Sequence, residues 1–148
     1  MNRRYFLIGS TAVASAAAVT VFWPAADATD GTRVIAADAA HAQAAAGEIW
    51  IIDIRRPDEW ARTGTPEGAI PLDMRRDDFL QALATATAAD PDRPVALICA
   101  RGVRSHRLTQ RLQDAGIAPV LDISEGMLGS SAGPGWLDRG LPTDQVES

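Results

Sequence analysis

Three short apolar runs along the chain have the length and the side chains of buried β-strands. They cover residues 49–54, 95–99 and 120–123, and they are rich in isoleucine, valine and leucine. A fourth run, 69–72, follows a stretch of turn residues and predicts another short strand. None is long enough for a buried helix, so we interpret all four as strands of one sheet.

Helical patterns separate these runs. Residues 34–46 are alanine-rich, contain no proline and stop at Gly47, while residues 77–88 are followed by a proline-rich break. Residues 104–115 place Leu108 and Leu112 on one face of an amphipathic helix. A short helical turn begins at Pro57. Strands that alternate with helices predict an α/β fold: one domain with a mainly parallel central sheet flanked by helices.

The N-terminus has the layout of an export signal. Arg3 and Arg4 precede the uncharged run 7–23, and an A-x-A cleavage site ends at Ala28. Residues 2–7 also resemble the twin-arginine export motif. We therefore predict a cleaved signal peptide at 1–28, a mature domain at 29–148 and a periplasmic location in a bacterium. The alternative is an uncleaved membrane anchor, although the run is shorter and richer in alanine than a typical spanning helix.

Composition narrows the function. A chain of 148 residues with 47% hydrophobic residues suits one globular domain. Its net charge of −5 argues against nucleic acid as a partner, because basic patches supply most of that affinity. One cysteine and two distant histidines do not have the spacing of a zinc site, and we expect no metal and no cofactor.

Cys99, the single cysteine, closes the second apolar run and is followed by a short loop and a helix. Ligands of open α/β sheets bind at the carboxyl ends of the strands, so this is a favoured place for a site. A glycine-containing loop can point its N–H groups inward, and the helix N-terminus adds partial positive charge. These features favour a thiolate and an anion-binding cradle. The predicted cradle consists of Ala100, Arg101, Gly102, Val103 and Arg104.

The chain resembles the rhodanese-homology domains at several places in the right order. The segment 99–105 is similar to their active-site loop, and Asp53 and Arg55 are similar to their D-x-R strand end. Residues 64–71 ("GTPEGAIP"), 125–127 and 140–142 match three further segments of the family. Thr65 and Glu67 depart from the pattern, where histidine and proline are usual. Residues 128–136 are longer than in short members, and we expect them to shape the substrate entrance.

The resemblance implies sulfur transfer. The Cys99 thiolate would take the outer sulfur of thiosulfate or a similar small anion and pass it to cyanide or a thiol, which could belong to a protein. Two alternatives remain open. One is a sulfur carrier or docking module with little turnover of its own. The other is a phosphatase or arsenate reductase, which we rank lower because Cys99 and Arg104 form C-x4-R rather than C-x5-R and Ile98 stands where histidine is usual.

Several side chains near the loop allow two roles each. Arg104 would either bind a sulfonate or lock the loop by pairing with Asp53, and Arg55 would lie either at the surface or beside the substrate. Arg101 is expected to be exposed at the loop crest. His106 would either reach the thiolate or lie solvated on the helix. Met127 and Trp136 would either line the pocket mouth or anchor the core.

Overall fold

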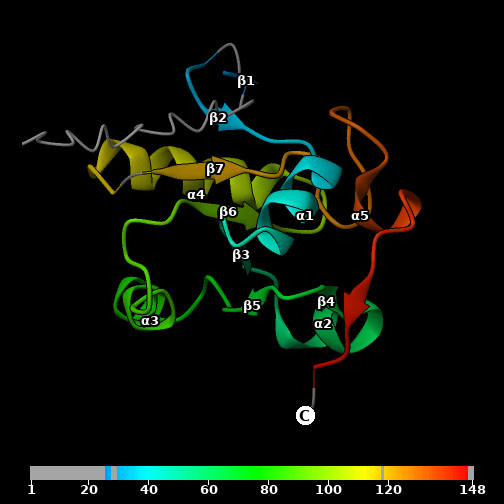
Figure 1. Ribbon diagram of the computed structural model, residues 1–148, viewed down its shortest axis with the longest axis horizontal. Helices are drawn as coiled ribbons and strands as arrows, with labels where there is room; N and C mark the ends of the chain where they lie inside the picture. The colour runs from blue at the N-terminus through cyan, green and yellow to red at the C-terminus, as the bar shows by residue number, and fades with distance from the viewer. Residues whose placement is uncertain (1–25, 28–29, 118, 147–148) are drawn as a thin grey trace, which may run out of the picture.

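A computed structural model describes residues 26–27, 30–117 and 119–146. Six strands form one sheet in the order β1-β2-β7-β6-β3-β5 (Figure 1). All neighbouring pairs are parallel except β1 with β2, which confirms the prediction of an α/β domain with a mainly parallel sheet. The strands of this sheet are β1 (Ala26–Asp27), β2 (Arg33–Val34), β3 (Trp50–Asp53), β5 (Ile70–Pro71), β6 (Val95–Ile98) and β7 (Val120–Asp122).

The helices lie on both faces of the sheet. Each predicted helix is present with shifted ends, and the first begins later than expected because Arg33–Val34 pair with β7 instead. A short helix near the C-terminus was not predicted. The helices are α1 (Ala37–Ala45), α2 (Pro57–Thr63), α3 (Phe79–Ala86), α4 (Val103–Asp114) and α5 (Gly135–Asp138).

The core is divided by the sheet into two layers. Ile51 points into a layer shared with α1 and α5, and its neighbour Ile52 points into the opposite layer with α3 and α4. This alternation follows from the two-residue period of a strand. Cys99 belongs to the α3–α4 layer, so its side chain faces the helix that follows it.

A second, two-stranded sheet closes the domain. Strand β4 (Thr65–Pro66) pairs antiparallel with β8 (Thr143–Asp144), which brings the C-terminal segment against the end of α2. Glycine is needed at position 64, where the backbone directly before β4 approaches β8 closely: its φ is +73°, and a Cβ there would lie 2.7 Å from the Asp144 carbonyl oxygen. Neither strand was predicted, because β4 lies in the stretch of turn residues before the run 69–72 and β8 lies in a C-terminal segment without an apolar run.

The predicted signal peptide lies outside the described residues except for β1. Cleavage after residue 28 would remove β1 and leave β2 as the edge of the sheet. Within the part of the chain that the structure describes, no helix has the length and apolarity needed to cross a membrane.

Candidate active site

Cys99 lies directly after β6 and is 1% exposed. Its Sγ lies 3.4 Å from the backbone nitrogen of Ser105 and 3.4 Å from the Ser105 Oγ, both in the first turn of α4. The Cys99 carbonyl accepts a hydrogen bond of 2.9 Å from the Met127 N–H, and the Leu128 N–H donates to the next carbonyl at 2.8 Å. The sulfur is therefore held from the helix side and its backbone from the 126–128 side.

Ser105 was not assigned a role from the sequence. Its hydroxyl also donates to the Gly102 carbonyl at 3.1 Å, so one side chain links the sulfur to the crest of the loop. A polar residue in the first turn of a helix that follows a candidate nucleophile was the available signal. Ser105 is completely buried, which leaves its hydroxyl to these internal contacts.

The loop keeps its shape because two glycines allow close approach of backbone segments. Gly102 has φ +82°, and a Cβ there would overlap the Ser124 carbonyl. At Gly126, with φ +67°, a Cβ would lie 2.5 Å from the Ala100 carbonyl oxygen. The loop is thus pressed against the 124–126 turn. Arg101 is exposed at the crest, as predicted, and so is Val103.

Arg104 pairs with Glu59 of α2, and the predicted pairing with Asp53 is wrong. Its two terminal nitrogens lie 2.7 and 2.9 Å from the two Glu59 carboxylate oxygens. The hydrogen bonds from Arg104 hold the pKa of Glu59 down at about 2. Asp53 is already occupied by Arg55 at 2.7 Å, so the partner of Arg104 comes from the next helix. Arg104 does lock the loop, but against α2.

Arg55 does not lie at the surface, because it is 1% exposed. Its guanidinium spans Asp53, the Thr63 hydroxyl at 2.9 Å and the Gly64 carbonyl at 2.7 Å. A buried arginine needs such complete pairing, since an unpaired charge there is strongly destabilising. The ion pair Asp53–Arg55 therefore connects the end of β3 to the end of α2, the helix that also carries Glu59.

The remaining candidates occupy structural positions. His106 faces two carboxylates, Asp30 and Asp122, and among the described residues its ring makes no hydrogen bond with the thiol. Trp136 and Met127 are completely buried, so they anchor the core and do not line a pocket mouth. His41 lies 3.1 Å from the Glu67 carboxylate and meets the Trp136 ring edge-on.

An open hollow of about 280 Å³ lies beside the loop of residues 99–104, which we call the catalytic loop. The loop supplies Arg101, Gly102 and Val103, and residues 130–132 form another wall. Part of the 128–136 segment thus borders this hollow, whose lining does not include Cys99, and its role at a substrate entrance stays a prediction. The buried Glu125 holds the end of the 128–136 segment in place: its carboxylate accepts a hydrogen bond of 3.0 Å from the Gly135 N–H and pairs with Arg139 at 2.7 Å.

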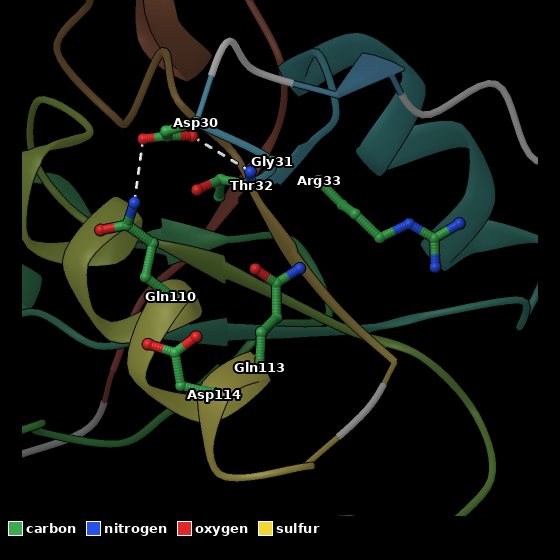
Figure 2. A pocket seen from close by; sticks show the side chains of 7 residues that line it. All are labelled: Asp30, Gly31, Thr32, Arg33, Gln110, Gln113 and Asp114. Atoms are coloured by element: carbon green, nitrogen blue, oxygen red, sulfur yellow. Dashed lines mark hydrogen bonds between the residues drawn. The ribbon is translucent and has the colours of Figure 1, made fainter.

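A larger hollow lies elsewhere, between α4 and the segment before β2. It has a volume of about 650 Å³ and is lined by polar side chains that include Asp30, Gln110 and Gln113 (Figure 2). It contains neither Cys99 nor a residue of the loop, so we do not assign it to the cysteine chemistry. In the described ranges no group of three His, Cys, Asp or Glu side chains is arranged to hold a metal ion.

The fold and the loop define a class of protein: an α/β domain with a buried cysteine at a strand end, enclosed by a short loop and a helix N-terminus. Residues 36–132 match the family model of the rhodanese-like domain, and the chain belongs to this family. A comparison of the sequence with curated proteins gives no match.

Solved structures agree with this family. The chain is 30% identical to a thiosulfate sulfurtransferase from Pseudomonas aeruginosa, with a TM-score of 0.62 over 79% of this chain and 21% of that one. It thus spans about a fifth of that enzyme. It is 25% identical to the polysulfide-sulfur transferase homodimer of Wolinella succinogenes, with a TM-score of 0.57 over 77% of this chain and 79% of that chain.

A third similar structure is a Rhodopseudomonas palustris protein of unknown function, a possible tyrosine phosphatase. It is 25% identical, with a TM-score of 0.59 over 78% of this chain and 86% of that chain. The family and the two transferases support sulfurtransferase activity, while this relative keeps the phosphatase alternative open for experiment.

Proposed function

We propose that the protein is a sulfurtransferase that carries sulfane sulfur as a persulfide on Cys99. The observation that supports this most directly is the sulfur itself: a single buried cysteine whose Sγ lies 3.4 Å from the backbone N–H of Ser105, inside a C-x4-R loop. Donors placed around a sulfur stabilise the negative charge that a thiolate or a persulfide carries there.

The reaction has two half-reactions. The Cys99 thiolate attacks the outer sulfur of a donor such as thiosulfate, the sulfur–sulfur bond of the donor breaks, and sulfite leaves with the electron pair. Cys99 then carries a persulfide anion. In the second half-reaction a thiolate or cyanide attacks the outer sulfur, the persulfide bond breaks, and the Cys99 thiolate is regenerated. The cycle needs no metal and no cofactor.

The arginines of the loop have separate roles in this scheme. Arg104 forms an ion pair with Glu59, so its role is to hold the loop in shape. Arg101 is exposed at the crest and meets no carboxylate of the described residues within 4.0 Å, which leaves its charge available for an incoming anionic donor. Thiosulfate and polysulfide are both anionic, and the two transferases among the similar structures are named for these two compounds.

The test is intact-mass analysis of the full chain after treatment with thiosulfate. We expect one added sulfur atom, which cyanide removes, and no adduct on Cys99→Ser, because a serine hydroxyl cannot hold a persulfide. Parallel kinetics with cyanide and with an aryl phosphate separate the alternatives. An adduct that cyanide discharges slowly would favour the carrier. Efficient phosphate hydrolysis without sulfur transfer would replace the proposal with the phosphatase.

We further propose that residues 1–28 export the protein to the periplasm and are removed, so that 29–148 is the mature domain. An unpaired cysteine in an oxidising compartment makes sense if the thiol has to be free and has no partner within its own chain. Replacing Arg3 and Arg4 by lysine should stop export, because a twin-arginine signal is read by a receptor. Normal periplasmic levels of that variant would indicate a general secretory signal, and a membrane-bound product would indicate an anchor.

A further inference from the structure

His106 lies between two carboxylates from different parts of the chain. Its Nε2 is 2.7 Å from the Asp30 Oδ2 in the segment before β2, and its Nδ1 is 3.3 Å from the Asp122 Oδ2 at the end of β7. Asp122 is completely buried, and its other oxygen, Oδ1, has no hydrogen-bond partner among the described residues. When both carboxylates are ionised they can only accept, and the two contacts then need a protonated ring, because only that form donates from both nitrogens.

Asp122 is connected to the crest of the catalytic loop. The same oxygen that faces His106 accepts a hydrogen bond of 2.6 Å from the Ser124 hydroxyl. The Ser124 carbonyl occupies the space where a side chain of residue 102 would stand, and therefore backs Gly102 directly. The Gly102 carbonyl in turn accepts a hydrogen bond of 3.1 Å from the Ser105 hydroxyl.

The last contact reaches the nucleophile, because the Ser105 Oγ and backbone nitrogen both lie 3.4 Å from the Cys99 Sγ. A continuous series of contacts thus runs from His106 through Asp122, the 124 turn and the loop crest to the sulfur. We propose that His106 is a positioning residue for sulfur transfer, whose charged ring holds Asp122 and, through it, the turn that sets the loop around Cys99. The inference rests on the proposed sulfur transfer.

The carboxylates around the ring favour its protonated form. Partial burial by itself lowers the pKa of His106, but the hydrogen bond to Asp30 and the charge of Asp122 outweigh burial and raise this pKa above its ordinary value. Arg101 and Arg107 border the same hollow as the ring and act in the opposite direction through their positive charge. Burial also raises the pKa of Asp122, against the hydrogen bonds that it accepts.

The sign of the pH dependence follows from this raised pKa. The double contact of His106 is complete at pH values below it and is lost as the pH rises through it, because a neutral ring keeps one donor for two carboxylates. We therefore expect the geometry of the loop to loosen as the pH rises through this raised pKa. The thiolate itself forms more readily as the pH rises, so the two effects oppose each other.

Two readouts test the inference on the full chain: the rate of Cys99 alkylation by iodoacetamide and the rate of sulfur transfer from thiosulfate to cyanide, each followed from mildly acid to alkaline pH. The chain has one cysteine and two histidines, so each readout refers to a known side chain. The variants are His106→Gln, which cannot titrate, and Asp30→Asn, which keeps the ring and removes the carboxylate that raises its pKa. His41→Gln is the matched control, since His41 also bonds a carboxylate but lies outside the site.

We expect transfer by His106→Gln to fall about tenfold near neutral pH, within the ~100-fold that a misplacement of about 1 Å can cost. The alkaline fall assigned to His106 should disappear in this variant, shift to lower pH in Asp30→Asn and stay unchanged in His41→Gln. Profiles of His106→Gln and Asp30→Asn that parallel the unsubstituted protein in both readouts would overturn the inference. Asp30→Asn alters an exposed residue and keeps the test valid if His106→Gln does not fold.

The alkylation readout separates this inference from the proposed function. If thiosulfate leaves no sulfur on Cys99, sulfur transfer is refuted, whereas the alkylation profiles still report whether His106 positions the loop. If transfer occurs and the profiles of the variants match, the proposed function stands and the role of His106 is refuted.

Discussion

Gly102 should be the residue of the catalytic loop that tolerates a side chain least. An alanine there would keep φ near +82° and place its Cβ 2.9 Å from the Ser124 carbonyl carbon and 3.3 Å from its Cα, in addition to overlapping the carbonyl oxygen. These are backbone atoms, so the overlap cannot be relieved by a side-chain rotation. The loop or the 124 turn must move instead.

The size of the effect follows from two contributions. A non-glycine residue at positive φ costs about 1–2 kcal/mol, and overpacking against a rigid neighbour costs about 1–3 kcal/mol more. We therefore expect Gly102→Ala to lower the free energy of unfolding by about 2–5 kcal/mol. Gly47→Ala is the matched control, because Gly47 has φ +73° and an added Cβ there would meet no described atom within 4 Å. It should show the conformational cost alone.

Urea unfolding monitored by tryptophan fluorescence compares the two variants, with the slope checked for constancy. Sulfur transfer should fall steeply in Gly102→Ala even where the protein is fully folded, since the moved crest carries the Ser105 contact with it. Equal stability losses in Gly102→Ala and Gly47→Ala would refute the steric argument. A folded Gly102→Ala with normal transfer would refute the link between the crest and the sulfur.

Three further changes test other parts of the site. Glu59→Gln removes the charge that pairs with Arg104 and should reduce sulfur transfer. The pKa of Glu59 is lowered to about 2, so the stabilisation that its charge gives is present at neutral pH and is lost as the pH falls. The unfolding midpoint of the variant should therefore depend less on acid pH. A glycine inserted between Gly102 and Val103 creates C-x5-R and should largely abolish transfer in paired kinetics with thiosulfate and an aryl phosphate; unchanged transfer would contradict the argument from loop size. Glu125→Ala leaves two buried N–H groups without their acceptor and leaves the Arg139 guanidinium with Asp38 as its remaining carboxylate partner. It should cost about 3–5 kcal/mol in denaturant unfolding, whereas a loss below about 1 kcal/mol would show that water replaces the Glu125 carboxylate.

The sequence pattern was sufficient to predict the α/β architecture and the position of Cys99 at the end of a central strand. The runs at 49–54, 95–99 and 120–123 became β3, β6 and β7 with ends shifted by one residue at most. Burial on both faces of a parallel sheet makes such strands continuously apolar, and this signal is local. The position of Cys99 followed from the end of one run and the start of the next helix, which are also local.

The partners of the charged residues could not be predicted in the same way. Arg104 and Glu59 are 45 positions apart, and their meeting depends on where the fold places the start of α2 relative to the start of α4. The competing prediction for Asp53 failed because Arg55, two residues away, reaches back to it inside the core. His106 and Asp30 are 76 positions apart and meet only because β2 adds to the edge of the sheet beside β7.

The order of the strands has a consequence for how the chain folds. Strand β2 is made early but pairs with β7, and the carbonyls of Cys99 and Ala100 are fastened by Met127 and Leu128, which come later still. Contacts between distant parts of a chain form slowly, because the intervening loop must be closed first. During synthesis Cys99 therefore emerges before the segment that fastens its backbone. Chains that stop short of this segment would leave the loop around the sulfur without that support and the cysteine open to oxidation, so the site takes its final shape only when the domain is nearly complete.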